Sequence, residues 1–166
     1  MEELRQILAT LKQPEYVHIL LNPIPVYGTI AGAVALVTGL ILKSRPAQLV
    51  ALLLILLSTL SVWPVMEYGE GGADRVHDLL NKDGQKWLHE HEERAEHLAF
   101  IFYVTAALAV VAMLAPKFLP KFATLATGLT LVAALASLLA GAYIGHAGGQ
   151  VRHTEFRQGP PPADEE

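Results

Sequence analysis

The sequence contains no cysteine. This absence excludes disulfide bonds, thiolate metal sites, iron–sulfur clusters and haem attached through a Cys-x-x-Cys-His motif. Charge is also scarce, because only 17% of the 166 residues are charged whereas 52% are hydrophobic. Soluble domains carry about 25% charged residues. The composition therefore favours a membrane protein over a soluble globular domain.

Four long stretches lack Asp, Glu, Lys, Arg and His altogether. They cover residues 24–42, 47–66, 98–115 and 122–144. Each is close to the ~20 residues that a helix needs to cross a hydrocarbon core of about 30 Å. Backbone groups in lipid must be hydrogen-bonded internally, and the stretches lack the alternation of barrel strands. Each stretch therefore predicts a membrane-spanning helix.

These features predict an all-α fold, an integral membrane four-helix bundle formed by residues 14–156. Residues 1–13 place leucine and isoleucine at helical spacing and predict a short amphipathic helix on the membrane surface or against a partner. The tail, residues 157–166, is rich in proline and acid, and we expect it to be disordered or bound to a partner.

The connection between the second and third spans is expected to be helical in part and to lie outside the membrane. Its glycines at residues 69–72 predict a flexible turn, residues 74–81 a short helix, and residues 82–84 another turn. A long helix is expected from Gln85 to the proline at position 116. At 100° per residue, His91 falls on the apolar side of that helix. Further on, Gly148 and Gly149 predict a bend after the fourth span.

The two short loops carry Lys43, Arg45, Lys117 and Lys121 and no acidic residue. Because cations in short loops favour the cytoplasm, both termini are expected on the non-cytoplasmic side. All seven histidines and all sixteen acidic residues then share that outer side. This segregation indicates a functional site, or else reflects only that polar residues must lie outside the spans.

Three motifs carry a resemblance to a known family. They are residues 17–28 with His18 and Asn22, residues 91–95 beginning His-Glu, and residues 148–155 beginning Gly-Gly. Together they resemble an uncharacterised bacterial family of small four-helix membrane proteins. The resemblance implies a multi-pass protein of the bacterial inner membrane. One departure is Pro23, which stands where the family has a second histidine.

Histidines from three segments are expected to meet at the outer end of the bundle. Helical bundles hold b-type haem between histidines of facing helices, and His18 with His91 is the pair we expect, with His153 or His146 as substitute. A non-haem metal is the alternative. Its ligands would be a set of imidazoles and carboxylates, since these suit zinc, iron or manganese: His91, Glu92, His153 and Glu155. The third possibility is that the histidines bind no cofactor and only bond across the bundle end.

Several function classes fit poorly. The net charge of −4 and the lack of a basic patch disfavour nucleic-acid binding. Spans without ionisable residues disfavour an ion-coupled transporter, and no known catalytic motif marks an enzyme. The sequence therefore predicts a small membrane subunit of a redox or electron-transfer assembly that docks against other membrane subunits. The alternative is a structural accessory subunit without a cofactor.

Overall fold

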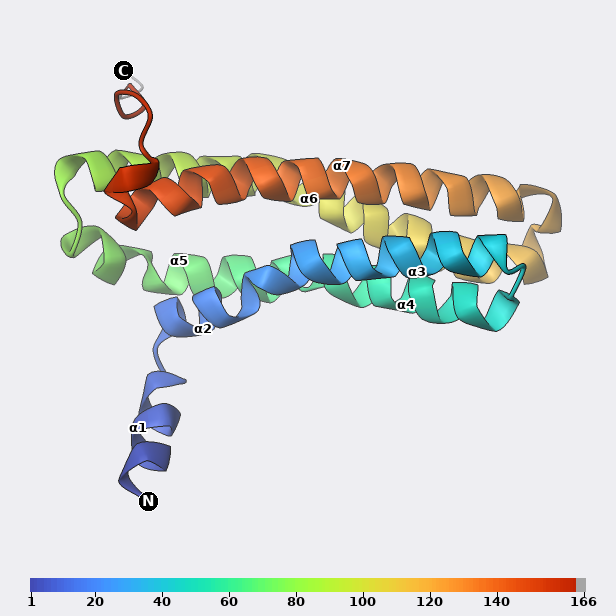
Figure 1. Cartoon of the computed structure of the whole chain (residues 1–166), viewed down its shortest axis with the longest axis horizontal. Coiled ribbons are helices and arrows are strands. Elements are labelled where there is room, and N and C mark those ends of the chain that lie inside the picture. Colours follow the sequence, from blue (N-terminus) through green and yellow to red (C-terminus); the bar gives the residue numbers. More distant parts are fainter. Residues whose placement is uncertain (164–166) are drawn as a thin grey trace. The chain divides into compact units, whose positions relative to one another are not determined.

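The computed structural model describes residues 1–163, and within them every regular element is helical (Figure 1). The α-helices, in chain order, are α1 Glu2–Thr10, α2 Pro14–Leu21, α3 Thr29–Ile41, α4 Arg45–Leu60, α5 Val62–Asp78, α6 Lys82–Phe118 and α7 Ala123–Arg152. A π-helical segment, η1 Ile24–Gly28, joins α2 to α3, and two short 3₁₀ segments, η2 Pro120–Phe122 and η3 Thr154–Phe156, flank α7.

Four helical segments are long and apolar enough to cross a membrane: Pro14–Ile41, Arg45–Asp78, Lys82–Phe118 and Pro120–Arg152. Three of the four uncharged stretches lie wholly inside these segments, and the first extends one residue beyond its segment. Large aliphatic side chains on these segments face outward, and those of Ile41 and Leu139 are each 74% exposed. Such side chains suit lipid contact, whereas a soluble surface rarely gathers them. The chain is a multi-pass membrane protein of the all-α, four-helix-bundle type, as the sequence predicts.

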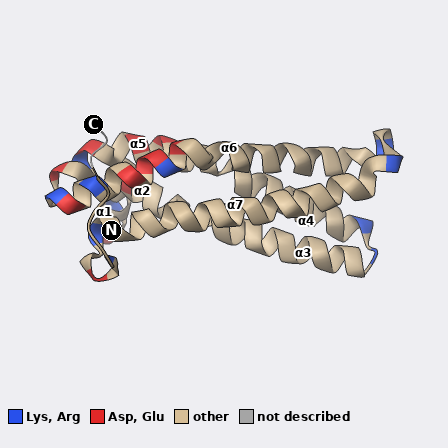
Figure 2. Ribbon diagram, turned by 90° about the horizontal axis from the view of Figure 1, so that it is seen from above, with Lys and Arg blue, Asp and Glu red and all other residues tan. Residues whose placement is uncertain are grey.

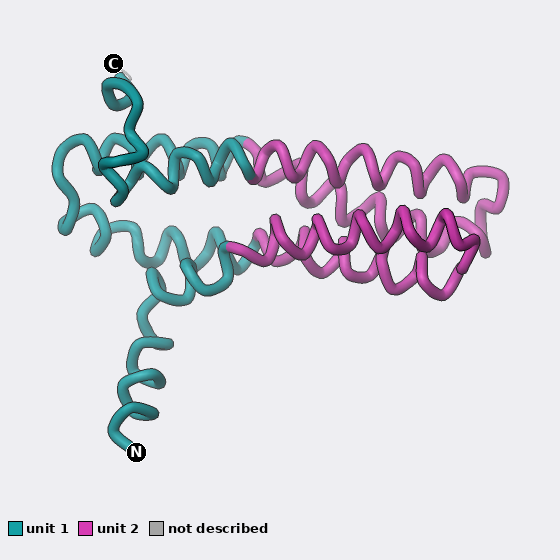
Figure 3. Tube along the Cα trace, viewed as in Figure 1, with its two compact units in different colours: residues 1–22, 63–97, 142–166 teal, residues 23–62, 98–141 magenta. Residues whose placement is uncertain are grey.

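The helices divide into two compact units, which are described separately (Figure 3). Unit 1 comprises Met1–Asn22, Trp63–His97 and Ala142–Glu166, and unit 2 comprises Pro23–Val62 and Leu98–Gly141. Every histidine belongs to unit 1, and so does every acidic residue that the structure describes. The expected concentration of ionisable groups in one part of the fold is therefore present.

Unit 2 is packed through small residues. A Cβ added at Gly32 would come within 2.7 Å of the Ile55 side chain, and one added at Gly39 within 3.0 Å of the Gln48 backbone nitrogen. Helices α3 and α4 approach each other closely at these points. In lipid, where the hydrophobic effect does not drive helices together, such close packing stabilises their association. In the same unit, the buried hydroxyls of Thr105 and Ser137 lie 2.8 Å apart and join α6 to α7 by a hydrogen bond.

Arg45 compensates for a proline inside α6. Pro116 has no N–H, so the carbonyl of Ala112, four residues earlier, loses its helical partner. The Arg45 guanidinium donates to that carbonyl at 3.2 Å and to the carbonyl of Met113 at 2.9 Å. The helix therefore continues to Phe118, because an arginine of α4 replaces the missing donor.

The first span begins earlier than the sequence predicts. The first uncharged stretch begins at residue 24, but the chain is already helical from Pro14. Prolines at positions 23 and 25 interrupt α-helical hydrogen bonding, and the chain passes them in the wider turns of η1. His18 consequently lies within helix α2.

Three glycine-based predictions are wrong. Gly69 and Gly72 lie within the continuous helix α5, and no turn forms there. The turn expected at residues 82–84 is the first turn of α6, where the Asn81 side chain accepts the backbone N–H of Gly84 at 2.9 Å. Helix α7 runs through Gly148 to Arg152 without the expected bend.

Candidate functional site

Within unit 1, acidic and basic residues lie together on α1, α2, α5 and the first part of α6 (Figure 2), whereas unit 2 carries only the four cations of the short loops. Two histidines of unit 1 come from separate segments and lie next to each other. The ring centroids of His18 and His91 are 6.2 Å apart, and their planes meet at 83°. We call these two residues the histidine pair.

His18 projects from α2 onto α5. Its ring Nδ1 lies 2.8 Å from the carbonyl oxygen of Val65. A carbonyl oxygen only accepts hydrogen bonds, so Nδ1 carries the proton. The ring also lies against Gly69, where an added Cβ would be 2.9 Å from Nδ1. The position of the ring therefore depends on a glycine.

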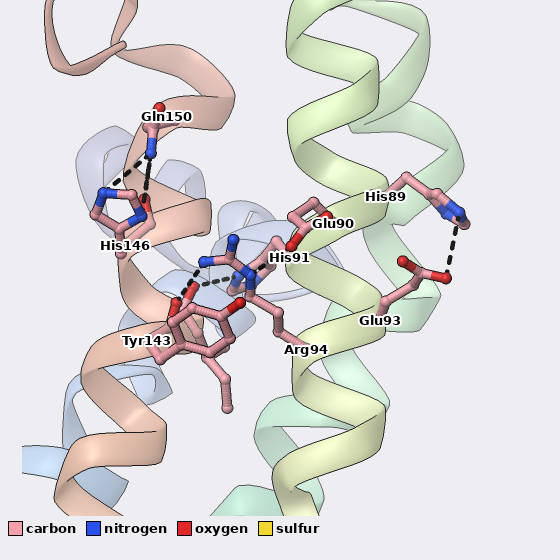
Figure 4. A network of polar contacts seen from close by, with 9 residues as sticks. His89, Glu90, His91, Glu93, Arg94, Tyr143, His146 and Gln150 are labelled. Atoms are coloured by element: carbon pink, nitrogen blue, oxygen red, sulfur yellow. Dashed lines mark hydrogen bonds and ion pairs between the residues drawn. The ribbon is translucent and has the colours of Figure 1, made fainter. Parts of the chain in front are cut away.

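His91 projects from α6 onto α7 in the same way (Figure 4). Its Nδ1 donates to the carbonyl oxygen of Ile144 at 3.0 Å. The ring lies against Gly148, where an added Cβ would be 3.0 Å from both Nδ1 and Cε1. The expectation that His91 faces the interior is correct, and Figure 4 shows His89 and Glu93 on the opposite side of α6.

The two histidines share one local design. In each case the glycine follows the accepting carbonyl by four residues: Gly69 follows Val65, and Gly148 follows Ile144. A helical side chain covers the surface of the turn that precedes it, so a larger residue at that position would cover the carbonyl. Glycine leaves the carbonyl open to a second donor. It also provides the space that the imidazole occupies.

Donation through Nδ1 fixes the chemistry of the other ring nitrogen. In the neutral imidazole, Nε2 then holds a lone pair that can bind a metal. Metal-ligating histidines in proteins characteristically donate their other nitrogen to a backbone carbonyl or carboxylate, which sets the orientation of the ring. Both members of the histidine pair have this arrangement.

Arg94 fastens α6 to α7 beside His91. Its Nε donates to Glu90 at 2.7 Å, and its NH1 donates to the carbonyl of Tyr143 at 3.0 Å. The guanidinium carbon also lies 3.8 Å from the centre of the Tyr143 ring, which places the cation over the aromatic face. With 13% of its side chain exposed, Arg94 holds the two helices together near the histidine pair.

His146 has different neighbours. Its ring lies edge-on to Trp87, 6.5 Å between centroids, and its ring nitrogens lie 3.1 and 3.3 Å from the amide nitrogen of Gln150. Trp87 belongs to a small apolar cluster with Ala147 and Val151. His146 therefore belongs to the packing of α6 on α7, not to the histidine pair.

His153 and Glu155 bond to each other at the end of α7. The distance between His153 Nδ1 and the Glu155 carboxylate is 2.9 Å, and both side chains are more than half exposed. The backbone N–H of Glu155, together with the His153 ring, holds the pKa of the Glu155 carboxyl below its usual value. The two residues form a local surface pair.

The expected non-haem ligand set does not assemble. Among residues 1–163, no three His, Asp or Glu side chains gather closely enough to hold a metal ion. The charges that act on Glu92 include His77 and Asp74 of α5. Among the described residues, His18 and His91 are the candidate ligands that the structure brings together from separate helices, whereas His153 and Glu155 form a local pair.

Sequence reasoning missed the residues that anchor the pair, namely Val65, Gly69, Ile144, Gly148 and Arg94. Both glycines were noticed, but as turn and bend signals. A hydrogen bond from a histidine to a carbonyl of another helix joins residues far apart in the sequence, so no local motif reveals it.

No protein-family model, curated protein sequence or solved structure matches the chain. The fold and the site define a helical membrane protein with two imidazoles anchored on backbone carbonyls.

Proposed function

We propose that the chain is a small integral membrane subunit of an electron-transfer assembly and that it binds b-type haem between His18 and His91. The observation that supports this most directly is the pair itself. Two imidazoles from different helices each use Nδ1 to bond a carbonyl, so each keeps Nε2 for a ligand.

The spacing of the rings agrees with shared coordination. With metal–nitrogen bonds of about 2 Å, two imidazoles whose ring centres are roughly 6 Å apart could both reach one metal ion. The observed separation is 6.2 Å. A haem bound there supplies reversible one-electron transfer. The chain's part is to fix both ligands, through the two carbonyls and the two glycines that admit the rings.

Haem is favoured over a metal ion bound without a macrocycle. An isolated zinc or iron ion in a protein takes three or four protein ligands, whereas haem iron needs only the axial ones. Within residues 1–163 the structure offers two imidazoles and no third ligand beside them. The chain lacks cysteine, so the attachment would be of the b type.

The first experiment is an absorption spectrum of protein purified from its native membrane. A Soret band and a reduced α band are expected, and both should be lost in His18→Ala and His91→Ala. The matched control is His89→Ala, since His89 lies on the same helix with an exposed side chain. Absence of haem from the unaltered protein, or bands retained in both pair variants, would reject the proposal. A cofactor-free accessory subunit would then be the better account.

The proposal includes a location in the bacterial inner membrane, with both termini on the non-cytoplasmic side. The motif resemblance and the cations of the short loops support it. Single cysteines can test it directly, because the chain has none of its own. An impermeant thiol reagent applied to intact cells lacking the outer membrane should label Gln13→Cys and Gln158→Cys. Leu119→Cys should react only after permeabilisation.

A further inference from the structure

Helix α1 and the residue after it present an apolar side that the other described residues leave about half exposed. Leucine and isoleucine recur there at helical spacing, and these side chains are from 41% to 57% exposed: Leu4, Ile7, Leu8 and Leu11. No residue of α1 is buried. On a helical wheel these four side chains share an arc of about 100°, while Arg5, Gln6 and Lys12 lie elsewhere on the wheel.

We infer that α1 lies along the membrane surface, with its apolar side in the boundary between lipid headgroups and acyl chains. Helices with this division of side chains bind in that layer. The inference does not depend on the proposed function.

The position of α1 in the chain places it near the bilayer. Only residues 11–13 separate it from Pro14, where the first candidate span begins. From Thr10 to Pro14 an extended chain reaches at most about 14 Å. Helix α1 therefore lies next to the start of the first candidate membrane-spanning segment.

The direction of α1 within unit 1 agrees with this location. In Figures 1 and 3, α1 leaves α2 at a steep angle and runs across the direction that α2 and α5 follow. Since α2 and α5 belong to candidate membrane-spanning segments, a helix running across them is oriented parallel to the bilayer surface.

Lipid fits the apolar side better than a second protein does. Stable protein interfaces bury about 800 Å² on each partner. The half-exposed side chains of Leu4, Ile7 and Leu8 on this nine-residue helix, together with Leu11 at its end, offer much less than this. Binding to a bilayer surface requires no such area. The span that follows α1 tethers it to the membrane and so raises the effective concentration of α1 at the bilayer surface. Arg5 and Lys12 can reach lipid phosphates from the edge of the helix.

Nitroxide labels on single cysteines test the inference in the full chain. The protein is reconstituted into vesicles of phosphatidylethanolamine and phosphatidylglycerol, and each label is probed with oxygen, which enters lipid, and with a nickel chelate, which stays in water. Leu4→Cys and Leu8→Cys should show a several-fold higher ratio of oxygen to nickel collisions than Gln6→Cys and Ala9→Cys.

Two results would overturn the inference. Equal nickel access at all four positions would mean that α1 stands in water. Labels at positions 4 and 8 that are shielded from both reagents would mean that protein covers the helix, either a second copy or another subunit. A chain without haem leaves this test unchanged, so failure of the proposed function and failure of the inference are distinguishable.

Discussion

The imidazole of His91 lies against Gly148, so close that an added Cβ would be 3.0 Å from its Nδ1 and Cε1. The same ring donates to a carbonyl one helical turn earlier in α7. A change at the glycine therefore acts on the histidine without altering the histidine itself.

Replacing Gly148 with alanine should move the His91 ring and weaken its bond to Ile144. Since the imidazole can turn away, we expect Gly148→Ala to be less stable than the control variant Gly145→Ala by about 1 kcal/mol, the typical contribution of the hydrogen bond that is given up. Thermal unfolding in detergent, followed by circular dichroism, measures it. The control is Gly145→Ala on the same helix, where a new Cβ meets no atom of the described residues within 4 Å. Because alanine favours helix over glycine, Gly145→Ala should be neutral or stabilising. Equal effects of the two variants would contradict the expectation.

Replacing Gly69 with alanine should displace the His18 ring, since the new Cβ would be 2.9 Å from Nδ1. The imidazole is the end of a flexible side chain, so it can turn away and give up its bond to Val65. We therefore expect a small change in melting temperature but a clear change in the ¹⁵N chemical shifts of His18. In the control, Gly71→Ala, the new Cβ makes an ordinary 3.5 Å contact with Pro14. Unchanged His18 shifts in Gly69→Ala would show that this glycine does not position the ring.

The angle between the paired rings predicts a spectroscopic signature for bound haem. Each ring is held by its own carbonyl, and their planes meet at 83°. If His18 and His91 held haem at this angle, the ferric protein would be expected to give a low-spin electron paramagnetic resonance spectrum dominated by one feature at high g. Parallel rings give three resolved g values. A haem-loaded protein with the parallel type of spectrum would retain the proposed function but refute this ring geometry.

Arg94→Lys should destabilise the contact between α6 and α7 by about 1–2 kcal/mol. Lysine keeps the charge but cannot reproduce the planar set of donors to Glu90 and Tyr143, nor the stacking on the ring. The control is Arg75→Lys. Arg75 pairs with Glu15 but is 60% exposed, and exposed ion pairs contribute about 0–1 kcal/mol. Thermal unfolding of both variants and the unaltered chain compares them. Equal losses would mean that the Arg94 geometry adds nothing beyond its charge.

The membrane spans were predictable because lipid imposes one requirement on every spanning segment, a sufficient length of uncharged helix. The inward direction of His91 was also predictable, since the helical period alone determines it. Pairing with His18 was expected from the topology. The anchoring carbonyls of Val65 and Ile144 could not be predicted, because every residue has a backbone carbonyl and the residue type does not show which one accepts a hydrogen bond.

The wrong predictions have a common cause. Gly69, Gly72 and Gly148 were interpreted through their conformational freedom, which favours turns. In the structure they remain helical and serve packing, since a Cβ at Gly72 would come within 2.7 Å of the Glu15 backbone. Local sequence cannot separate these two uses of glycine, because the deciding neighbour belongs to a distant segment.

Arg45 has a consequence for how the orientation of the chain is studied. It is one of the four loop cations that would direct insertion, and in the finished fold it also supplies the donor that Pro116 lacks. Neutralising it would alter a topogenic signal and leave a carbonyl of α6 without a partner in a single step. Charge-reversal mapping of the hairpin ends should therefore use Lys43, Lys117 and Lys121, so that a flipped chain is not confused with a misassembled one.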